Sequence, residues 1–106
     1  MSPFSSEILE IQNSHNSHIQ DEINRTITLI NQTRQIISLL QEKRTVLINE
    51  LNQLYNDVVH FDALGIEFEI IKNELKKTAD TICVLYNVVI RHAIQRVHIL
   101  RTQLTS

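Results

Sequence analysis

Residues 19–61 read IQDEINRTITLINQTRQIISLLQEKRTVLINELNQLYNDVVHF and decide the fold of this chain. Apolar residues recur there at alternating steps of three and four, as in the two contact columns, or seam, of a seven-residue repeat. The stretch contains no Gly and no Pro, so nothing in it would end a helix. It therefore predicts one long helix that lies against other helices. The columns are Ile23, Ile30, Ile37, Arg44, Leu51 and Val58, and Thr26, Thr33, Leu40, Leu47, Leu54 and Phe61.

This seam is wider than a single partner helix requires. Ile27, Ile48 and Tyr55 lie beside it on one side, and Leu29 and Ile36 lie beside it on the other. A two-stranded coiled coil carries mostly charged residues at those positions. The pattern predicts packing against two or three helices, as in a helical bundle.

Arg44 interrupts the apolar seam. One interpretation is that its aliphatic stem packs while the guanidinium reaches water. The other is that a polar seam residue fixes the register of the helices. In a hairpin, Arg44 would lie level with Tyr86, where a cation–π contact could form.

Gly65 is the only glycine, and the apolar frame changes there. A glycine just past a helix end, followed by an apolar residue such as Ile66, is typical of a Schellman ending. We expect an all-α antiparallel hairpin over residues 19–104 with Gly65 as its hinge; one long kinked helix is the alternative. The hairpin requires Leu54 to lie near Leu75, and both chain ends to lie towards the same end of the molecule.

The second half of the hairpin carries apolar residues spaced eleven apart, such as Leu75, Tyr86 and Val97, which predicts a nearly straight stripe. Residues 82–90 are apolar on every side, and a helix of that kind is buried on every side. We expect this segment to lie level with residues 39–48 and to be covered by another chain. The expected partner interface is Ile27, Ile36, Ile48, Val84, Val88 and Ile90, and the expected polar seam residues are Arg44, His92 and Arg96.

Residues 13–18 read NSHNSH, a polar run of low helix propensity. Ser17 and Gln20 match a capping box, so we expect the long helix to begin at about Ile19. Residues 1–18 would then form a short helix or a flexible segment. A helix that continues through from Ser6 is the alternative.

The amino-acid composition limits the classes of fold and function that fit this chain. The chain has 106 residues with one Gly, one Pro, no Trp and 5% aromatics, which favours an elongated helical bundle over a compact globule. A net charge of −2 argues against general nucleic-acid binding. Cys83 is the only cysteine, and we expect it to be a small buried residue. The sequence shows no secretory signal and no apolar run of membrane-spanning length, so we expect a cytoplasmic or nuclear protein.

No motif points to chemistry. His15 and His18 could share a helix face, but no third metal ligand lies near them in sequence. The chain has no spacing of a catalytic triad and no phosphate-binding glycine loop. We expect no metal, no cofactor, no small-molecule substrate and no enzymatic activity.

Residues 21–26 (DEINRT) and the general pattern of two long helices over residues 19–104 resemble snapin-like subunits of lysosome-related-organelle complexes. Small kinetochore and microtubule-ring subunits share the coarse pattern. The resemblance implies a non-catalytic scaffold or adaptor subunit whose partners are other helical subunits. One alternative is a small obligate homo-oligomer with a regulatory or packaging role. Another is a binder of anionic surfaces, membrane or nucleic acid, that uses Arg91, Arg96 and Arg101 with Ile94 and Val97 between them.

Overall fold

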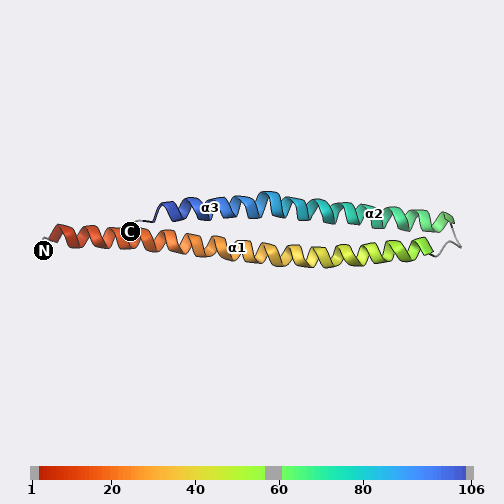
Figure 1. The fold of residues 1–106 in the computed structure, drawn as a ribbon, viewed down its shortest axis with the longest axis horizontal. Helices are drawn as coiled ribbons and strands as arrows, with labels where there is room; N and C mark the ends of the chain where they lie inside the picture. Colours follow the sequence, from red (N-terminus) through yellow and green to blue (C-terminus); the bar gives the residue numbers. More distant parts are fainter. Residues whose placement is uncertain (1–2, 57–60, 105–106) are drawn as a thin grey trace.

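The computed structural model describes residues 3–56 and 61–104, with side chains described for residues 6–56 and 65–104. Helix α1 spans Pro3–Asn56, α2 spans Phe61–Val84, the π-helix η1 spans Leu85–Ile90 and α3 spans Arg91–Thr102. Helices α2, η1 and α3 follow one another as a single rod, the second arm, which runs antiparallel to α1 (Figure 1). The molecule measures 88 × 15 × 15 Å. The predicted all-α hairpin is therefore confirmed, and the start of α1 and the end of α3 lie towards the same end (Figure 1).

Helix α1 passes through residues 13–18 without the break that the sequence suggested. For this part of the chain, the alternative of a helix that continues through from Ser6 is the arrangement found. Polar residues without Gly or Pro cost a helix only about 0.5 kcal/mol each, which is too little to end it. The run also touches the second arm, since His15 Nε2 donates to the carbonyl oxygen of Gln103 at 3.3 Å.

The chain reverses before Gly65, not at it. Gly65 lies inside α2, its φ is not positive, and Ile66 is 68% exposed, so no Schellman ending forms there. A glycine inside a helix costs about 1 kcal/mol relative to Ala, which the flanking helix-forming residues tolerate. The predicted seam residue Val58 and the side chain of Phe61 lie outside the described residues.

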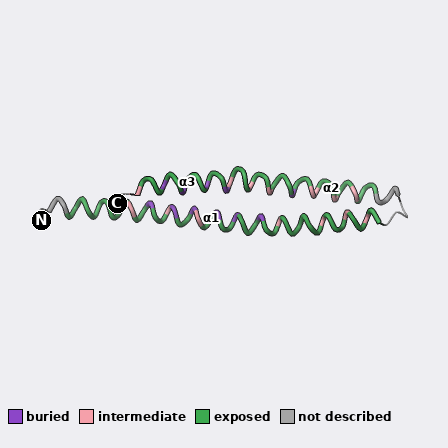
Figure 2. The backbone as a smooth tube through the Cα atoms, viewed as in Figure 1, coloured by how far each residue is buried: buried purple, intermediate pink, exposed green. Residues whose placement is uncertain are grey.

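Apart from Arg44, the described residues of the predicted α1 seam are buried or half-buried against the second arm, as the facing sides of the two arms in Figure 2 show. Ile23 and Ile37 are the most enclosed side chains, at 2% exposure each. Fully burying such a side chain contributes about 1.5–3 kcal/mol. Buried Thr26 and Thr33 each donate their hydroxyl to the carbonyl four residues earlier, so neither of these two hydroxyls is left unpaired. The cluster at the end near residue 19 contains Ile19, Ile23, Ile30, Ala93, Val97 and Leu100, with Ile27 and Leu104 packed against it.

The register of the arms follows from the aromatic contact between Tyr55 and Phe68, whose ring centroids lie 5.4 Å apart with an edge-to-face angle of 73°. Counting seam residues from this contact places Leu54 beside Phe68 and Leu75 beside Leu47. The expected neighbours Leu54 and Leu75 are therefore about 10 Å apart along the axis, at 1.5 Å per residue. That expectation was wrong because it placed the turn at Gly65.

The second arm holds one extra seam residue. From Phe68 to Leu104 the arm contains one residue more than the facing stretch of α1, Ile19 to Leu54. The surplus residue falls at the adjacent pair Val89 and Ile90. Val89 is half-buried and Ile90 is 5% exposed, and both lie opposite Thr33 of α1. The π-helix η1 absorbs it, because a π-turn fits one more residue into a helical turn than an α-turn does.

The frame shift at η1 explains why the predicted eleven-residue stripe was wrong. Burial follows steps of three and four up to Val89 and again from Ile90, with the second series displaced by one residue. Spacings of eleven also occur within an ordinary three–four seam, as from Ala93 to Leu104, and so do not require an eleven-residue repeat. Ala79 and Tyr86, which the stripe included, are exposed.

Candidate interaction surfaces

The hairpin has two lateral sides, each formed by residues next to the seam on both arms. On α1, Glu22, Leu29, Ile36 and Lys43 are seven residues apart and share one side of the helix. We call this side, with the second-arm residues that meet it, the paired face. Its second-arm residues are Glu74, Thr81, Val88 and Arg96.

Two ion pairs between the arms define the paired face. Arg96 Nη2 lies 3.2 Å from Glu22 Oε2, and Lys43 Nζ lies 3.3 Å from Glu74 Oε2. All four side chains are 41% to 61% exposed, so each pair contributes at most about 1 kcal/mol to stability. Their main effect is to place charges of known sign at fixed points on the surface.

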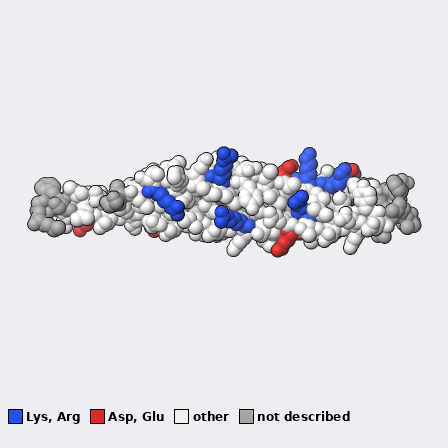
Figure 3. Space-filling model, viewed as in Figure 1, with Lys and Arg blue, Asp and Glu red and all other residues white. Residues whose placement is uncertain are grey.

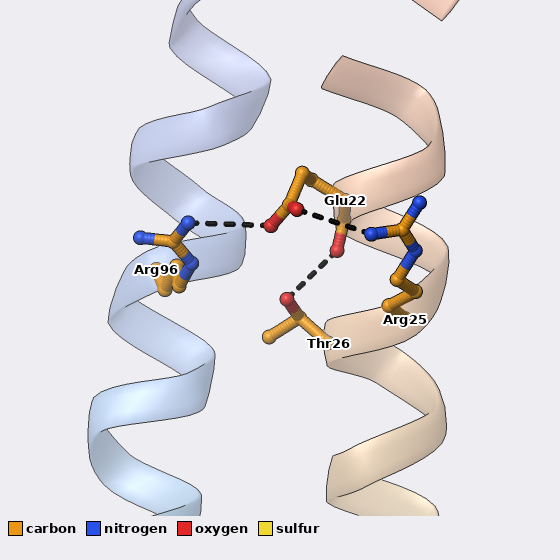
Figure 4. A network of polar contacts seen from close by, with 4 residues as sticks. All are labelled: Glu22, Arg25, Thr26 and Arg96. Carbon is orange, nitrogen blue, oxygen red and sulfur yellow. Dashed lines mark hydrogen bonds and ion pairs between the residues drawn. The ribbon is translucent and has the colours of Figure 1, made fainter. Parts of the chain in front are cut away.

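Glu22 is the centre of a small polar network (Figure 4). Its second carboxylate oxygen, Oε1, accepts from Arg25 Nη1 at 3.5 Å, and its main-chain carbonyl accepts from the Thr26 hydroxyl at 2.8 Å. Arg96 reaches it from the facing helix (Figure 4). The carboxylate is therefore oriented by both arms.

Between the two ion pairs the paired face is apolar and open to water. Leu29, Ile36 and Val88 are 47%, 49% and 46% exposed. Leu39 and Val84 lie one helical turn from them and are 64% and 53% exposed. An apolar area of this kind with charged residues at its ends is typical of a protein interaction site.

The π-turn is what brings Arg96 onto this face. Glu74, Thr81 and Val88 are seven apart, but Arg96 follows Val88 by eight. In an uninterrupted helix the residue in line with Val88 would be Gln95. The Glu22–Arg96 ion pair is therefore a consequence of the extra residue in η1.

The opposite side, which we call the basic face, follows the same spacing. Ile27, Arg34, Ile48 and Tyr55 line it on α1. Every charged residue at its seven-spaced positions is basic. Figure 3 shows a face of the molecule on which Lys and Arg side chains from both arms predominate. The second-arm residues are Lys72, Ala79, Tyr86, Ile94 and Arg101.

Arg44 leaves the seam and lies at a groove of the second arm. It is exposed, and counting along the seam places it beside Thr78, which is 3% exposed and bonds the carbonyl of Glu74 at 2.8 Å. The expectation that Arg44 lies level with Tyr86 was wrong, because the register places it level with Thr78, although both Arg44 and Tyr86 line this groove. The cation–π contact found among the described residues is a different one, Lys72 over Phe68 at 5.6 Å. The groove is completed by Ala79, Ile82, Cys83 and Asn87.

The predicted interface residues separate into three locations. Ile36, Val84 and Val88 belong to the paired face, while Ile27 (half-buried) and Ile48 (37% exposed) belong to the basic face. In the third location, the interior of the hairpin, Ile90 is 5% exposed and offers no surface to a partner. The segment 82–90 lies level with residues 33–40, not 39–48, again because the turn comes earlier than expected.

Three further expectations are corrected. His92 and Arg96 are exposed, because the extra residue at η1 moves the seam from the frame that would contain them to Ala93 and Val97. Cys83 is exposed, since it lies beside the seam and not in it.

The arginines proposed for anionic surfaces do not form one stripe. Arg96 is paired with Glu22 on the paired face, and Val97 is 7% exposed inside the seam. Arg101 belongs to the basic face. The basic groups that share the basic face are therefore drawn from both arms, and of the three expected arginines only Arg101 is among them.

Within residues 3–56 and 61–104, no three His, Cys, Asp or Glu side chains converge on a point where a metal could bind. Across the same ranges, no helix combines the length and the apolar character needed to cross a bilayer.

The ion pairs and the π-turn were not foreseen from the sequence. The available signal was the adjacent pair Val89 and Ile90 between two regular three–four series, which indicates an inserted residue. Placing Arg96 after that insertion would have predicted its contact with Glu22.

Comparisons with known protein families, with curated proteins and with solved structures found no match to this chain. The resemblance to snapin-like subunits rests on residues 21–26 and the helical pattern alone.

Proposed function

We propose that this chain is a non-catalytic helical subunit that assembles with other helical proteins as a scaffold or adaptor. One observation carries the proposal: among the described residues, sixteen large apolar side chains are exposed and eight apolar side chains are buried. A hairpin in isolation would leave this apolar surface in water, where further helices would cover it favourably. We place the assembly in the cytoplasm or nucleus, where the exposed thiol of Cys83 would stay reduced.

The basic face supports a partner of a different sequence. Ile48 and Ile94 supply apolar contacts there, and Arg34 and Arg101 supply positive charge with no acidic residue at the equivalent positions. Lys72 also lies on this face, with its ammonium 3.8 Å from the Glu69 carboxylate. A second copy would bring like charges together on this face. The surface fits a helix with apolar residues at steps of three and four and with Asp or Glu on either side of them.

A crosslinking experiment tests the proposal. A photoreactive amino acid replaces Ile94 on the basic face or, as the control, Asn73 on the exposed outer side of α2. In extracts of the source cells we expect a protein crosslink from position 94 only, mapped to a helix with acidic residues beside its apolar stripe. The purified partner should then lose at least about tenfold in affinity for the chain carrying Ile48→Glu and Ile94→Glu. Asn73→Glu should leave the affinity unchanged.

Two results would overturn the proposal. One is a crosslink from position 94 to nucleic acid or lipid, which would favour the anionic-surface alternative. The other is an equal yield of crosslinks from positions 94 and 73, which would mean that the basic face has no dedicated partner.

A further inference from the structure

We propose that the paired face binds a second copy of this chain, so that two hairpins form a two-fold symmetric four-helix bundle. The inference rests on the proposed function, in that the chain assembles through its lateral faces, and it names the partner for one of them. It is carried by the charge pattern of the face and by the position of its apolar centre.

The four charged groups form a self-complementary pattern. At one end of the apolar centre, α1 carries negative Glu22 and the second arm carries positive Arg96. At the other end, α1 carries positive Lys43 and the second arm carries negative Glu74. Charges on each arm are thus opposite at the two ends, and charges at each end are opposite between the arms. A face with this arrangement attracts its own copy when the two are related by a two-fold rotation.

The apolar residues are centred on the same axis. The midpoint between Glu22 and Lys43 on α1 is also the midpoint between Leu29 and Ile36. Turning a second hairpin end for end about the point midway between the two ion pairs places the Glu22 carboxylate against the Lys43 ammonium of the copy. The same rotation brings the exposed Leu29 and Ile36 side chains of the two copies into one apolar centre, so apolar and charged contacts form together.

On the second arm, the midpoint between Glu74 and Arg96 falls at Leu85, at the start of η1, beside exposed Val84 and Val88. This centre is displaced along the axis, because Leu85 lies level with Ile37, about 7 Å from the α1 midpoint at 1.5 Å per residue. The charged groups of the two arms nevertheless meet in the two ion pairs, so one two-fold axis midway between these pairs serves both arms. Rotation about that axis places the Arg96 guanidinium against the Glu74 carboxylate of the copy, and exposed Val84 and Val88 lie between these charged groups. In the bundle, each ion pair within a hairpin gains a partner of opposite charge above it, and the exposed apolar centre is removed from water.

The first test is the mass of the purified full chain by sedimentation velocity and light scattering at about 150 mM salt. We expect a dimer. The variant Ile36→Glu with Val88→Glu should be monomeric, while its circular dichroism remains that of a helical chain. The matched control on the other side, Ile48→Glu with Ile94→Glu, should remain dimeric. A helical monomer for the unsubstituted chain would overturn the inference and would leave the basic-face partner to be judged by its own crosslinking experiment.

A charge exchange tests the geometry. Glu22→Lys with Arg96→Glu preserves the ion pair within each hairpin but places like charges together in the end-for-end dimer. We expect the dimer to weaken at least about tenfold. Adding Lys43→Glu with Glu74→Lys exchanges the charges at the other end and should restore it. An unchanged dimer in the first variant would overturn the end-for-end arrangement, because a dimer with the hairpins parallel keeps Glu22 and Arg96 complementary after the exchange.

Discussion

Deleting Val89 should leave the hairpin folded with almost unchanged stability, although a residue is removed from the middle of a helical arm. Val89 is the surplus residue of the second arm, and Ile90 beside it already occupies the buried position at the level of Thr33. Without Val89 the two arms have equal numbers of residues between their seam contacts. The π-turn can then become ordinary α-helix with every other seam residue in place.

The size of the effect follows from burial. Val89 is half-buried, so its loss removes about 1 kcal/mol of the 1.5–3 kcal/mol that full burial of such a side chain contributes. Regular α-helical hydrogen bonds in place of the π-turn offset part of that. We expect a net change within about 1 kcal/mol, which corresponds to a shift in the unfolding temperature of no more than about 8 °C.

Deletion of Lys77 is the matched control, because it also shortens the second arm by one residue but does so away from the surplus. Residues 78–89 must then rotate by one position, which replaces Ile82 and Leu85 in the seam with Cys83 and Tyr86. We expect a loss of about 2–4 kcal/mol. The assay is urea unfolding followed by circular dichroism at one fixed protein concentration. If the two deletions destabilise the chain equally, the surplus residue is not located at η1 and the register argued from it is wrong.

The register itself can be checked by crosslinking: with Cys83→Ser, a cysteine pair at Leu54 and Phe68 should form a disulfide within one chain, while a pair at Leu54 and Leu75 should not, because that pair is about 10 Å apart along the axis. Non-reducing electrophoresis separates the two cases, and an efficient intrachain disulfide from the second pair would place the turn at Gly65 after all. Replacing Thr33 with Val should stabilise the hairpin by up to about 0.8 kcal/mol, because the Thr33 hydroxyl bonds only its own helix and a methyl group would add apolar burial in the seam. Urea unfolding measures this change, and destabilisation would mean that the hydroxyl contributes more to the fold than the methyl group can replace.

The sequence by itself determined the local character of this protein. The three–four spacing of apolar residues over 19–61 predicts the long helix and the residues that face its partner, and those within the described range are buried or half-buried apart from Arg44. This could be predicted because the periodicity depends only on neighbours within two turns of the same helix. The same reasoning identified Ile36, Val84 and Val88 as exposed apolar positions beside or outside the seam.

The tertiary structure decided the register. Sliding one arm by a whole heptad leaves the same local pattern on both helices, so only the sum of contacts along the seam selects Leu54 beside Phe68. The same sum makes the π-turn at Leu85–Ile90 favourable, since one locally costly turn keeps both ends of the seam in contact. His92 therefore lies outside the seam, and Arg96 meets Glu22 across the two arms. No pattern within either helix contains that contact, because it depends on the combined length of both.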